Sequence, residues 1–227
     1  MIGPLVNALA IIVASLIGLG LRRVLKTSLL DSTMSVLGLI VLVIGIYGVT
    51  MDMTMIYVIL SLVIGLWIGE SLDLELKVKQ NLEKVLKLQD SQDSLLHGFL
   101  TASVLFVVGA MAIIGSIESG INQNHIIVFT KSTLDFVAAM MLSATLGIGV
   151  LFSFIPVLLY QGAITWFAGE ISVWLNDTTL TIISSVGNIL VMGLGFNMLK
   201  ITQYKMINLL PSILVALVIA QLLNFFQ

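Results

Sequence analysis

The amino-acid sequence predicts an all-α fold, a polytopic bundle of about eight transmembrane helices that forms a single membrane domain over residues 1–227. Composition predicts the membrane, since hydrophobic residues make up 59% of the chain, charged residues only 10%, and the mean hydropathy is +1.14. A soluble domain carries about 25% charged residues, because water must wet its surface. One span needs about 20 mainly apolar residues, so the chain accommodates eight spans with short connections.

Residues that favour helix ends separate the apolar stretches. Pro4 suits the first turn of a helix, where a backbone N–H has no intrahelical partner. Asp31, Asp52 or Thr54, and Asn176 offer side chains that cap helix N-termini. No basic residue precedes the first apolar stretch, so we expect a retained span rather than a cleaved signal peptide. The predicted spans cover about residues 4–21, 33–50, 54–69, 97–117, 132–152, 155–174, 178–199 and 206–225.

Prolines mark two interruptions in the second half of the chain. Residues 132–174 are too long an apolar stretch for one helix, and Pro156 is the natural break. A broken helix from Gly147 to Pro156 would leave carbonyls free to bind an ion. Pro211 predicts a kink near the start of the last span.

Residues 71–92 differ from the spans around them. Apolar residues such as Leu74 and Val78 recur at helical spacing, with lysines and a glutamate between them. This pattern predicts an amphipathic helix on the membrane surface. Such a helix either links two spans or binds lipid headgroups or a partner.

The basic residues are distributed asymmetrically between the predicted loops. Eight spans place nine of the ten basic residues on one side, and Lys131 is the exception. The positive-inside rule makes that side cytoplasmic and places both termini outside. A seven-span count would weaken this asymmetry. The nine residues are Arg22, Arg23, Lys26, Lys77, Lys79, Lys84, Lys87, Lys200 and Lys205.

An internal similarity relates spans one to three to spans six to eight. Residues 61–70 read SLVIGLWIGE and residues 212–221 read SILVALVIAQ. A shift of five spans gives the two units opposite orientations, and such inverted repeats are common in secondary transporters. Two apolar helices also resemble each other through composition alone, which is the alternative. The paired positions include Pro4 with Pro156, Asp31 with Asp177, Gly38 with Gly187, Gly65 with Ala216, and Gly69 with Ala220.

Four amides inside or beside the spans are candidate residues for binding a substrate or ion: Asn7, Gln161, Asn197 and Asn208. Polar groups at membrane depth cost energy and usually face the bundle interior or a cavity. An amide binds a cation through its oxygen or an anion through its NH2 group. The alternative role is to hold helices together by hydrogen bonds.

Asp135 is the candidate acidic residue of the site. Lys131 lies one turn earlier on the same helical face, so the spacing allows an i,i+4 ion pair. A carboxylate at this position would bind or couple a proton or cation. Alternatively, Ser132 and Asp135 form a capping box at the start of the fifth span.

Several classes of function are not supported by the sequence. The chain has no cysteine and no H-E-x-x-H, G-x-S-x-G or phosphate-binding-loop motif, so we expect neither an enzyme nor a cofactor. The net charge of −2 provides no basic surface for nucleic acid. The expected partners are the lipid bilayer and a small solute or ion. Whether the chain forms a homo-oligomer is left open.

Five short segments in this order resemble a known family of bacterial inner-membrane proteins. The segments are Met1-Ile2-Gly3-Pro4 with Asn7, Lys131-Ser132-x-Leu134-Asp135, Leu146-Gly147-Ile148, Pro156 with Gln161, and Asn208-Leu209-Leu210-Pro211. They are similar to proteins of the YqgA/YdfK type, a family of unknown function whose members are often labelled transport proteins. The resemblance implies a bacterial cytoplasmic membrane and several helices, but no substrate.

The resulting hypothesis is a membrane protein that moves a small solute or ion. Asn7 and Gln161 would line the site from symmetry-related helices, Asn208 would lie beside a proline kink, and Asp135 would gate or couple protons. The alternatives are an ion channel, or a membrane scaffold or regulator that acts through the helix of residues 71–92.

Overall fold

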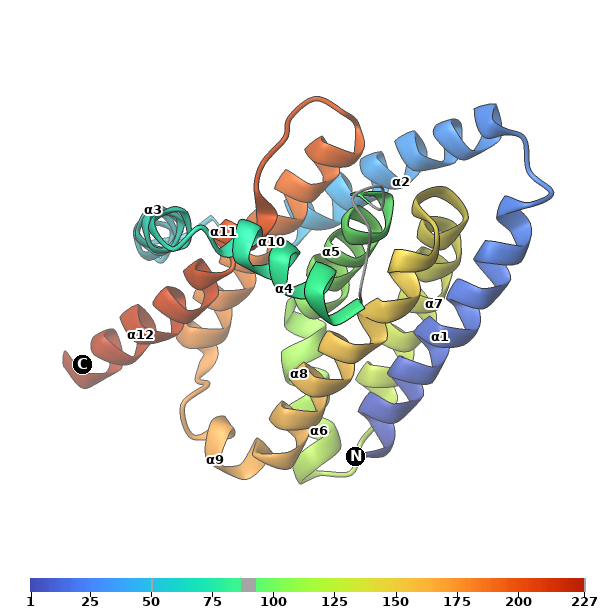
Figure 1. Ribbon diagram of the computed structural model, residues 1–227. Helices are drawn as coiled ribbons and strands as arrows, with labels where there is room; N and C mark the ends of the chain where they lie inside the picture. The colour runs from blue at the N-terminus through green and yellow to red at the C-terminus, as the bar shows by residue number, and fades with distance from the viewer. Residues whose placement is uncertain (50, 87–92, 227) are drawn as a thin grey trace.

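The computed structural model describes residues 1–49, 51–86 and 93–226, and these contain helices and no strand (Figure 1). The predicted all-α fold is therefore confirmed. The elements are α1 (Ile2–Arg22), α2 (Thr27–Tyr47), α3 (Met55–Ser71), α4 (Leu74–Leu86), α5 (Asp93–Val107), α6 (Ala110–Ile121), α7 (Ile126–Leu146), the 3-10 helix η1 (Ile148–Ser153), α8 (Phe154–Trp166), α9 (Ala168–Ser172), α10 (Asp177–Met198), α11 (Met206–Leu209) and α12 (Pro211–Phe226).

Six helical segments of the described residues are long and apolar enough to cross a membrane. The number rises to 8 when two bent pairs of helices are each counted as one span. These pairs are α3 with α4, bent by 51°, and α5 with α6, bent by 59°. The predicted count of eight is the upper end of this range.

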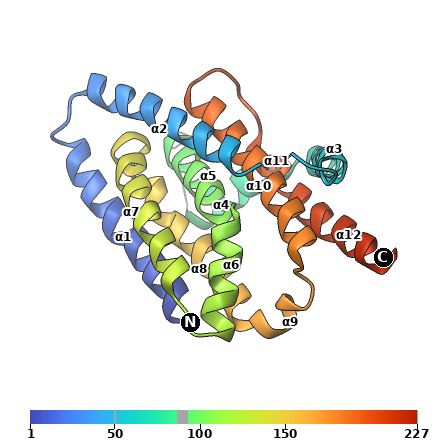
Figure 2. The same cartoon turned by 180° about the vertical axis from the view of Figure 1, so that it is seen from behind.

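The helices form a compact body with a projecting pair. Within the body, α1 packs against both α7 and α8, and α2 crosses α10 (Figure 1). Helix α12 packs against α3, and both extend away from α1 and α7, as Figure 2 shows from behind. Burial follows this arrangement, because 67% of the span in α10 is buried but only 17% of that in α2. Most of the surface of α2 is therefore exposed in the single chain.

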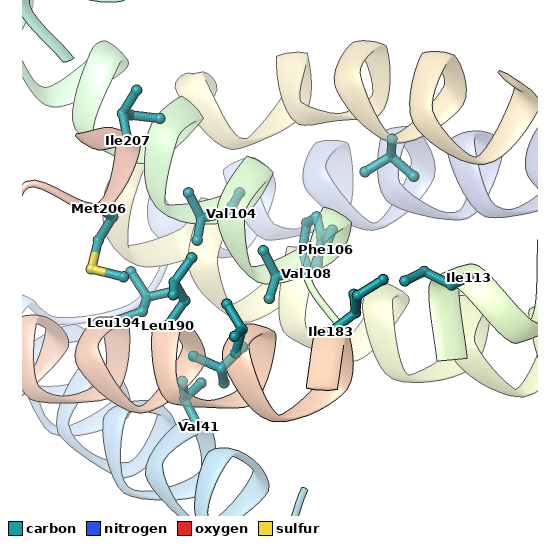
Figure 3. Packing of buried hydrophobic residues seen from close by; sticks show 14 of the residues in the cluster. Val41, Val104, Phe106, Val108, Ile113, Ile183, Leu190, Leu194, Met206 and Ile207 are labelled. Carbon is teal, nitrogen blue, oxygen red and sulfur yellow. The ribbon is translucent and has the colours of Figure 1, made fainter. Parts of the chain in front are cut away.

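Apolar side chains from distant parts of the chain fill the centre of the body (Figure 3). Phe106 of α5 is fully buried, and Leu190 and Leu194 of α10 lie beside Met206 of α11. Lipid is as apolar as these side chains, so close packing rather than exclusion from water stabilises such contacts.

Glycines allow the close approach of α3 to α12 at Gly65 and to α11 at Gly69, as the Gly65-x-x-x-Gly69 spacing predicts. A Cβ at Gly65 would lie 2.3 Å from Ser212 Cα, and one at Gly69 would lie 1.9 Å from the Asn208 carbonyl oxygen. Neither position has room for a larger residue unless the partner backbone moves.

The predicted caps have different outcomes. Asn176 caps α10, because its side chain accepts a hydrogen bond from the Thr179 N–H at 2.8 Å. Thr54 precedes α3, and its hydroxyl and backbone N–H donate to Asp52, which lowers the pKa of that carboxyl. The Asp31 cap is wrong, since α2 already begins at Thr27. Hydroxyls in this first part of α2 bond back to carbonyls four residues earlier and remain compatible with a helix.

Three predicted spans also differ in their ends. Helix α7 begins six residues before position 132 and ends at Gly147, whose φ of 87° is a conformation that favours glycine. The helix therefore breaks before Pro156, which lies in the first turn of α8. The fourth span bends at Gly109, with φ of 134°.

The amphipathic helix appears as α4, while its predicted end, residues 87–92, lies outside the described residues.

Candidate functional site

Four polar side chains meet between α1, α7 and α8: Asn7, Lys131, Asp135 and Gln161. We call them the amide–acid cluster. The Asn7 Nδ2 group donates to Asp135 Oδ2 at 2.9 Å and to Gln161 Oε1 at 3.2 Å. The Lys131 ammonium donates to the same Asp135 oxygen. Asn7 and Gln161 are 0% exposed, Lys131 5% and Asp135 7%. Three residues proposed from separate spans are thus in direct contact.

The close packing of α1 on α7 positions Asn7. A Cβ at Gly18 would lie 2.1 Å from the Met140 carbonyl oxygen, so the two backbones approach closely there. One turn away, the Ser143 hydroxyl donates to the Ser15 carbonyl oxygen at 3.0 Å. Small residues and hydroxyls are typical of such contacts between membrane helices. They fix the register of α1 and hold Asn7 opposite Asp135.

Asp135 does not cap a helix, so the capping-box interpretation is wrong. Helix α7 begins at Ile126, and Asp135 lies in its third turn. The i,i+4 pair with Lys131 that the spacing allows is present in the structure. Removing one partner of a buried ion pair costs about 3–5 kcal/mol, because the other charge is left uncompensated.

Two atoms of the cluster lack a hydrogen-bond partner among the described residues: the acceptor Asn7 Oδ1 and the donor Gln161 Nε2. Leaving a buried polar group unpaired costs about 1–3 kcal/mol. Such groups in native proteins often mark a functional site or a place for water or an ion. The cluster therefore offers both an oxygen and an NH2 group to a ligand.

A cavity of about 330 Å³ opens at the end of the body where the N-terminus lies (Figure 1). Its polar lining includes Ser119, His125 and Thr165, and the Ser119 hydroxyl and His125 Nδ1 are 2.8 Å apart. Thr165 follows Gln161 by one helical turn, about 6 Å along the axis. The cavity thus lies one turn beyond the cluster. The sequence alone does not reveal this cavity, because its lining comes from segments that only the fold brings together.

Asn197 lies outside the cluster and closes the loop between α10 and α11. Its side-chain Nδ2 donates to the Tyr204 carbonyl oxygen at 2.8 Å, and its Oδ1 accepts from the Tyr204 N–H at 2.9 Å. The Thr202 hydroxyl also donates to Asn197 Oδ1. The interactions of this amide are local.

Asn208 also lies apart from the cluster, at the junction of α11 with α4. Its Oδ1 accepts from the Glu75 N–H at 2.8 Å, and Glu75 Oε2 accepts from the Ile207 N–H at 3.3 Å. This reciprocal pair joins α4 to the start of the last span.

A family model described as "Protein of unknown function (DUF554)" matches residues 2–221 of the chain. The chain belongs to the DUF554 family. It is 29% identical over 230 residues to the "Uncharacterized membrane protein YdfK" of Bacillus subtilis (strain 168), covering 100% of this chain and 98% of that protein. It is 30% identical over 222 residues to the "Uncharacterized protein YqgA" of Escherichia coli (strain K12), covering 95% and 94% of the two chains. No solved structure matches.

These DUF554 relatives confirm the resemblance to proteins of the YqgA/YdfK type, and the apolar helices agree with the membrane in the name of the Bacillus protein. Within this member of DUF554, the cluster offers chemistry for a small polar ligand. Carboxylate and amide oxygens are ligands for hard cations, while NH2 and ammonium groups bind anions.

Proposed function

We propose that this protein transports a small solute or ion across the bacterial cytoplasmic membrane and that the amide–acid cluster is its binding site. One observation carries the proposal. Four buried polar side chains from three membrane-crossing segments converge, and two of their atoms lack a hydrogen-bond partner among the described residues. Ionisable and polar groups at membrane depth are costly and usually mark a pathway for ions or substrates.

The pairing of helices supports an inverted repeat. Under the proposed repeat, α1, α2 and α3 correspond to α8, α10 and α12. Each of these pairs is in contact. A two-fold axis between the units would pass through all three contacts, and the Asn7–Gln161 hydrogen bond joins the first pair. Transporters with inverted repeats bind their substrates at such an interface.

The placement of the loops supports the proposed orientation. The α1–α2 and α10–α11 connections, which carry Arg22, Arg23, Lys200 and Lys205, lie at the same end in both views (Figure 1, Figure 2). The N-terminus lies at the opposite end, beside the cavity. With the basic end cytoplasmic, the cavity opens to the outside and serves as the external entrance to the cluster.

A scaffold or regulator acting through α4 is the second candidate. Leu74 and Val78 of α4 pack against the apolar core, and Lys77 on the same helix is exposed. A helix fixed in this way presents a charged face to a partner. Removing the exposed charge by Lys77→Ala would abolish partner capture under this alternative but leave solute flux unchanged under transport.

A ligand screen followed by flux measurement tests the proposal. A ligand that binds the folded state raises the melting temperature of the purified protein. We expect at least one ion or small metabolite to do so, and reconstituted liposomes to take up that ligand with saturating kinetics. Stabilisation without flux, or flux that rises linearly as through a channel, would contradict the transporter.

A further inference from the structure

We propose that the amide–acid cluster binds a small monovalent cation, Na⁺ or a proton, at the Asp135 carboxylate in exchange for the Lys131 ammonium. This inference rests on the proposed function for its role in transport, but cation binding is testable without flux. In the structure, the Lys131 ammonium binds the Asp135 carboxylate, and both side chains belong to α7.

The arrangement of oxygens favours a cation over an anion. The Asn7 Nδ2 group is 2.9 Å from Asp135 Oδ2 and 3.2 Å from Gln161 Oε1, so both oxygens face one point. Rotating the Asn7 amide by half a turn replaces that NH2 group with Oδ1, which has no hydrogen-bond partner among the described residues. Asn7 Oδ1 would then lie beside the Asp135 and Gln161 oxygens, and the three helices would offer a cation three side-chain oxygens. Oxygen ligands of this kind suit hard cations.

Charge balance selects a monovalent cation. The hydrogen-bond partners of the carboxylate are the Lys131 ammonium from α7 and the neutral Asn7 amide from α1. The element on the other side, α8, contributes the neutral amide of Gln161. A monovalent cation bound to the Asp135 carboxylate keeps the site neutral after the ammonium leaves. A divalent ion would leave an excess positive charge at membrane depth, which is costly.

The displaced ammonium would have to move toward the start of α7. Lys131 is one helical turn closer than Asp135 to the start of α7, where His125 lines the cavity. A lysine near a helix end can extend its apolar stem and keep its charged group at the membrane surface. Exchange therefore carries the ammonium toward the cavity while the cation occupies the carboxylate.

The experiment measures the melting temperature of the detergent-purified protein against NaCl, with choline chloride holding ionic strength constant. Wild type is compared with Lys131→Met, which removes the competing charge, and Asp135→Asn, which removes the cation-binding carboxylate. Lys131→Met should lower the NaCl concentration for half-maximal stabilisation by about tenfold or more. Asp135→Asn should abolish the response. To test the proton as the cation, the melting temperatures of the same three proteins are measured without NaCl as a function of pH.

A matched control is available in the exposed ion pair of Lys205 and Glu70, whose Nζ and Oε2 atoms are 3.3 Å apart. Lys205→Met should leave the cation response as in wild type. Because Asp135→Asn could unfold the protein, Asp135→Asn combined with Lys131→Met provides a neutral cluster and should show no response. The same half-maximal concentration in Lys131→Met as in wild type would overturn the proposal.

The outcomes separate the two proposals. If Lys131→Met strengthens the stabilisation by the cation in detergent, but liposomes show no flux of any solute, the cation site is retained and transport is rejected. If solute flux is the same in NaCl, in choline chloride and across the pH range, and no cation stabilises Lys131→Met, transport is retained and the cation site is rejected.

Discussion

At the scale of single residues, Asp135 has the most demanding environment in the molecule. Its carboxylate is buried beside lipid-facing helices, yet it accepts hydrogen bonds from an ammonium and an amide. A charge in such a place is stable only while it is compensated. The i,i+4 spacing supplies that compensation within one helix, so the pair forms wherever α7 forms.

The first prediction concerns this compensation. Asp135→Asn leaves the buried Lys131 ammonium unpaired and should destabilise the fold by about 3–5 kcal/mol. Adding Lys131→Met removes the uncompensated charge and should restore a large part of that loss. Melting temperatures of the two single variants and the double variant in detergent measure the coupling.

Glu70→Gln is the control, because it breaks an exposed ion pair and should leave the melting temperature unchanged. If the effects of Asp135→Asn and Lys131→Met simply add, the two side chains do not depend on each other in the folded protein.

At the scale of helices, close backbone contacts take the place that burial from water has in soluble proteins. The contact of α3 with α11 depends on glycine, since a Cβ at Gly69 would meet the Asn208 carbonyl oxygen at 1.9 Å. That oxygen belongs to the backbone and cannot rotate aside. The two helices must therefore separate if the glycine is replaced.

We predict that Gly69→Val destabilises the protein by about 1–3 kcal/mol or more through overpacking. Gly20→Ala is the matched control, because no atom lies within 4 Å of a Cβ built at Gly20 in α1. That change should be neutral or stabilise the helix slightly. Thermal unfolding in detergent compares the two. Equal effects would mean that α3 and α11 are not in close contact.

Some features of the helices and their contacts can be predicted from the sequence, and others cannot. Hydropathy identifies the apolar helices, and an acid or amide within one is conspicuous, so Asn7, Asp135 and Gln161 were identifiable before their contact was known. Helix starts were less predictable. Asp31 and Ser132 resemble caps, but in the fold the hydroxyl of Ser132 donates to the Val128 carbonyl oxygen, as a residue inside a helix can.

The bend at Gly109 and the cavity beside His125 could not be predicted for a different reason. A single glycine in an apolar stretch is compatible with a straight helix as well as with a break. The cavity depends on how α1, α6 and α8 converge at one end, which no local pattern encodes.

At the scale of the whole molecule, orientation determines which compartment the cavity faces. The proposed topology places the α6–α7 loop outside and the α1–α2 and α10–α11 loops inside. Exposed positions are available in each, with Val24 81% and Ile201 65% exposed. The chain has no cysteine of its own, so single introduced cysteines report these loops without background.

We predict that Asn122→Cys reacts with a membrane-impermeant maleimide added to intact cells. Val24→Cys and Ile201→Cys should react only after the membrane is permeabilised. The reverse pattern would invert the molecule and place the cavity on the cytoplasmic side. Labelling of Val24→Cys and Ile201→Cys from opposite sides would reject the paired loops.

The most direct test of transport through the amide–acid cluster is the initial rate of ligand uptake into liposomes by Gln161→Leu. This substitution removes the amide but keeps a buried side chain of similar size, and the exposed Lys205→Met serves as the reference variant. We predict that uptake falls by about tenfold or more in Gln161→Leu, since one lost hydrogen bond to a ligand is worth on the order of 1.4 kcal/mol. Lys205→Met should transport as wild type does. Equal uptake by the two folded variants would contradict a binding site in the cluster.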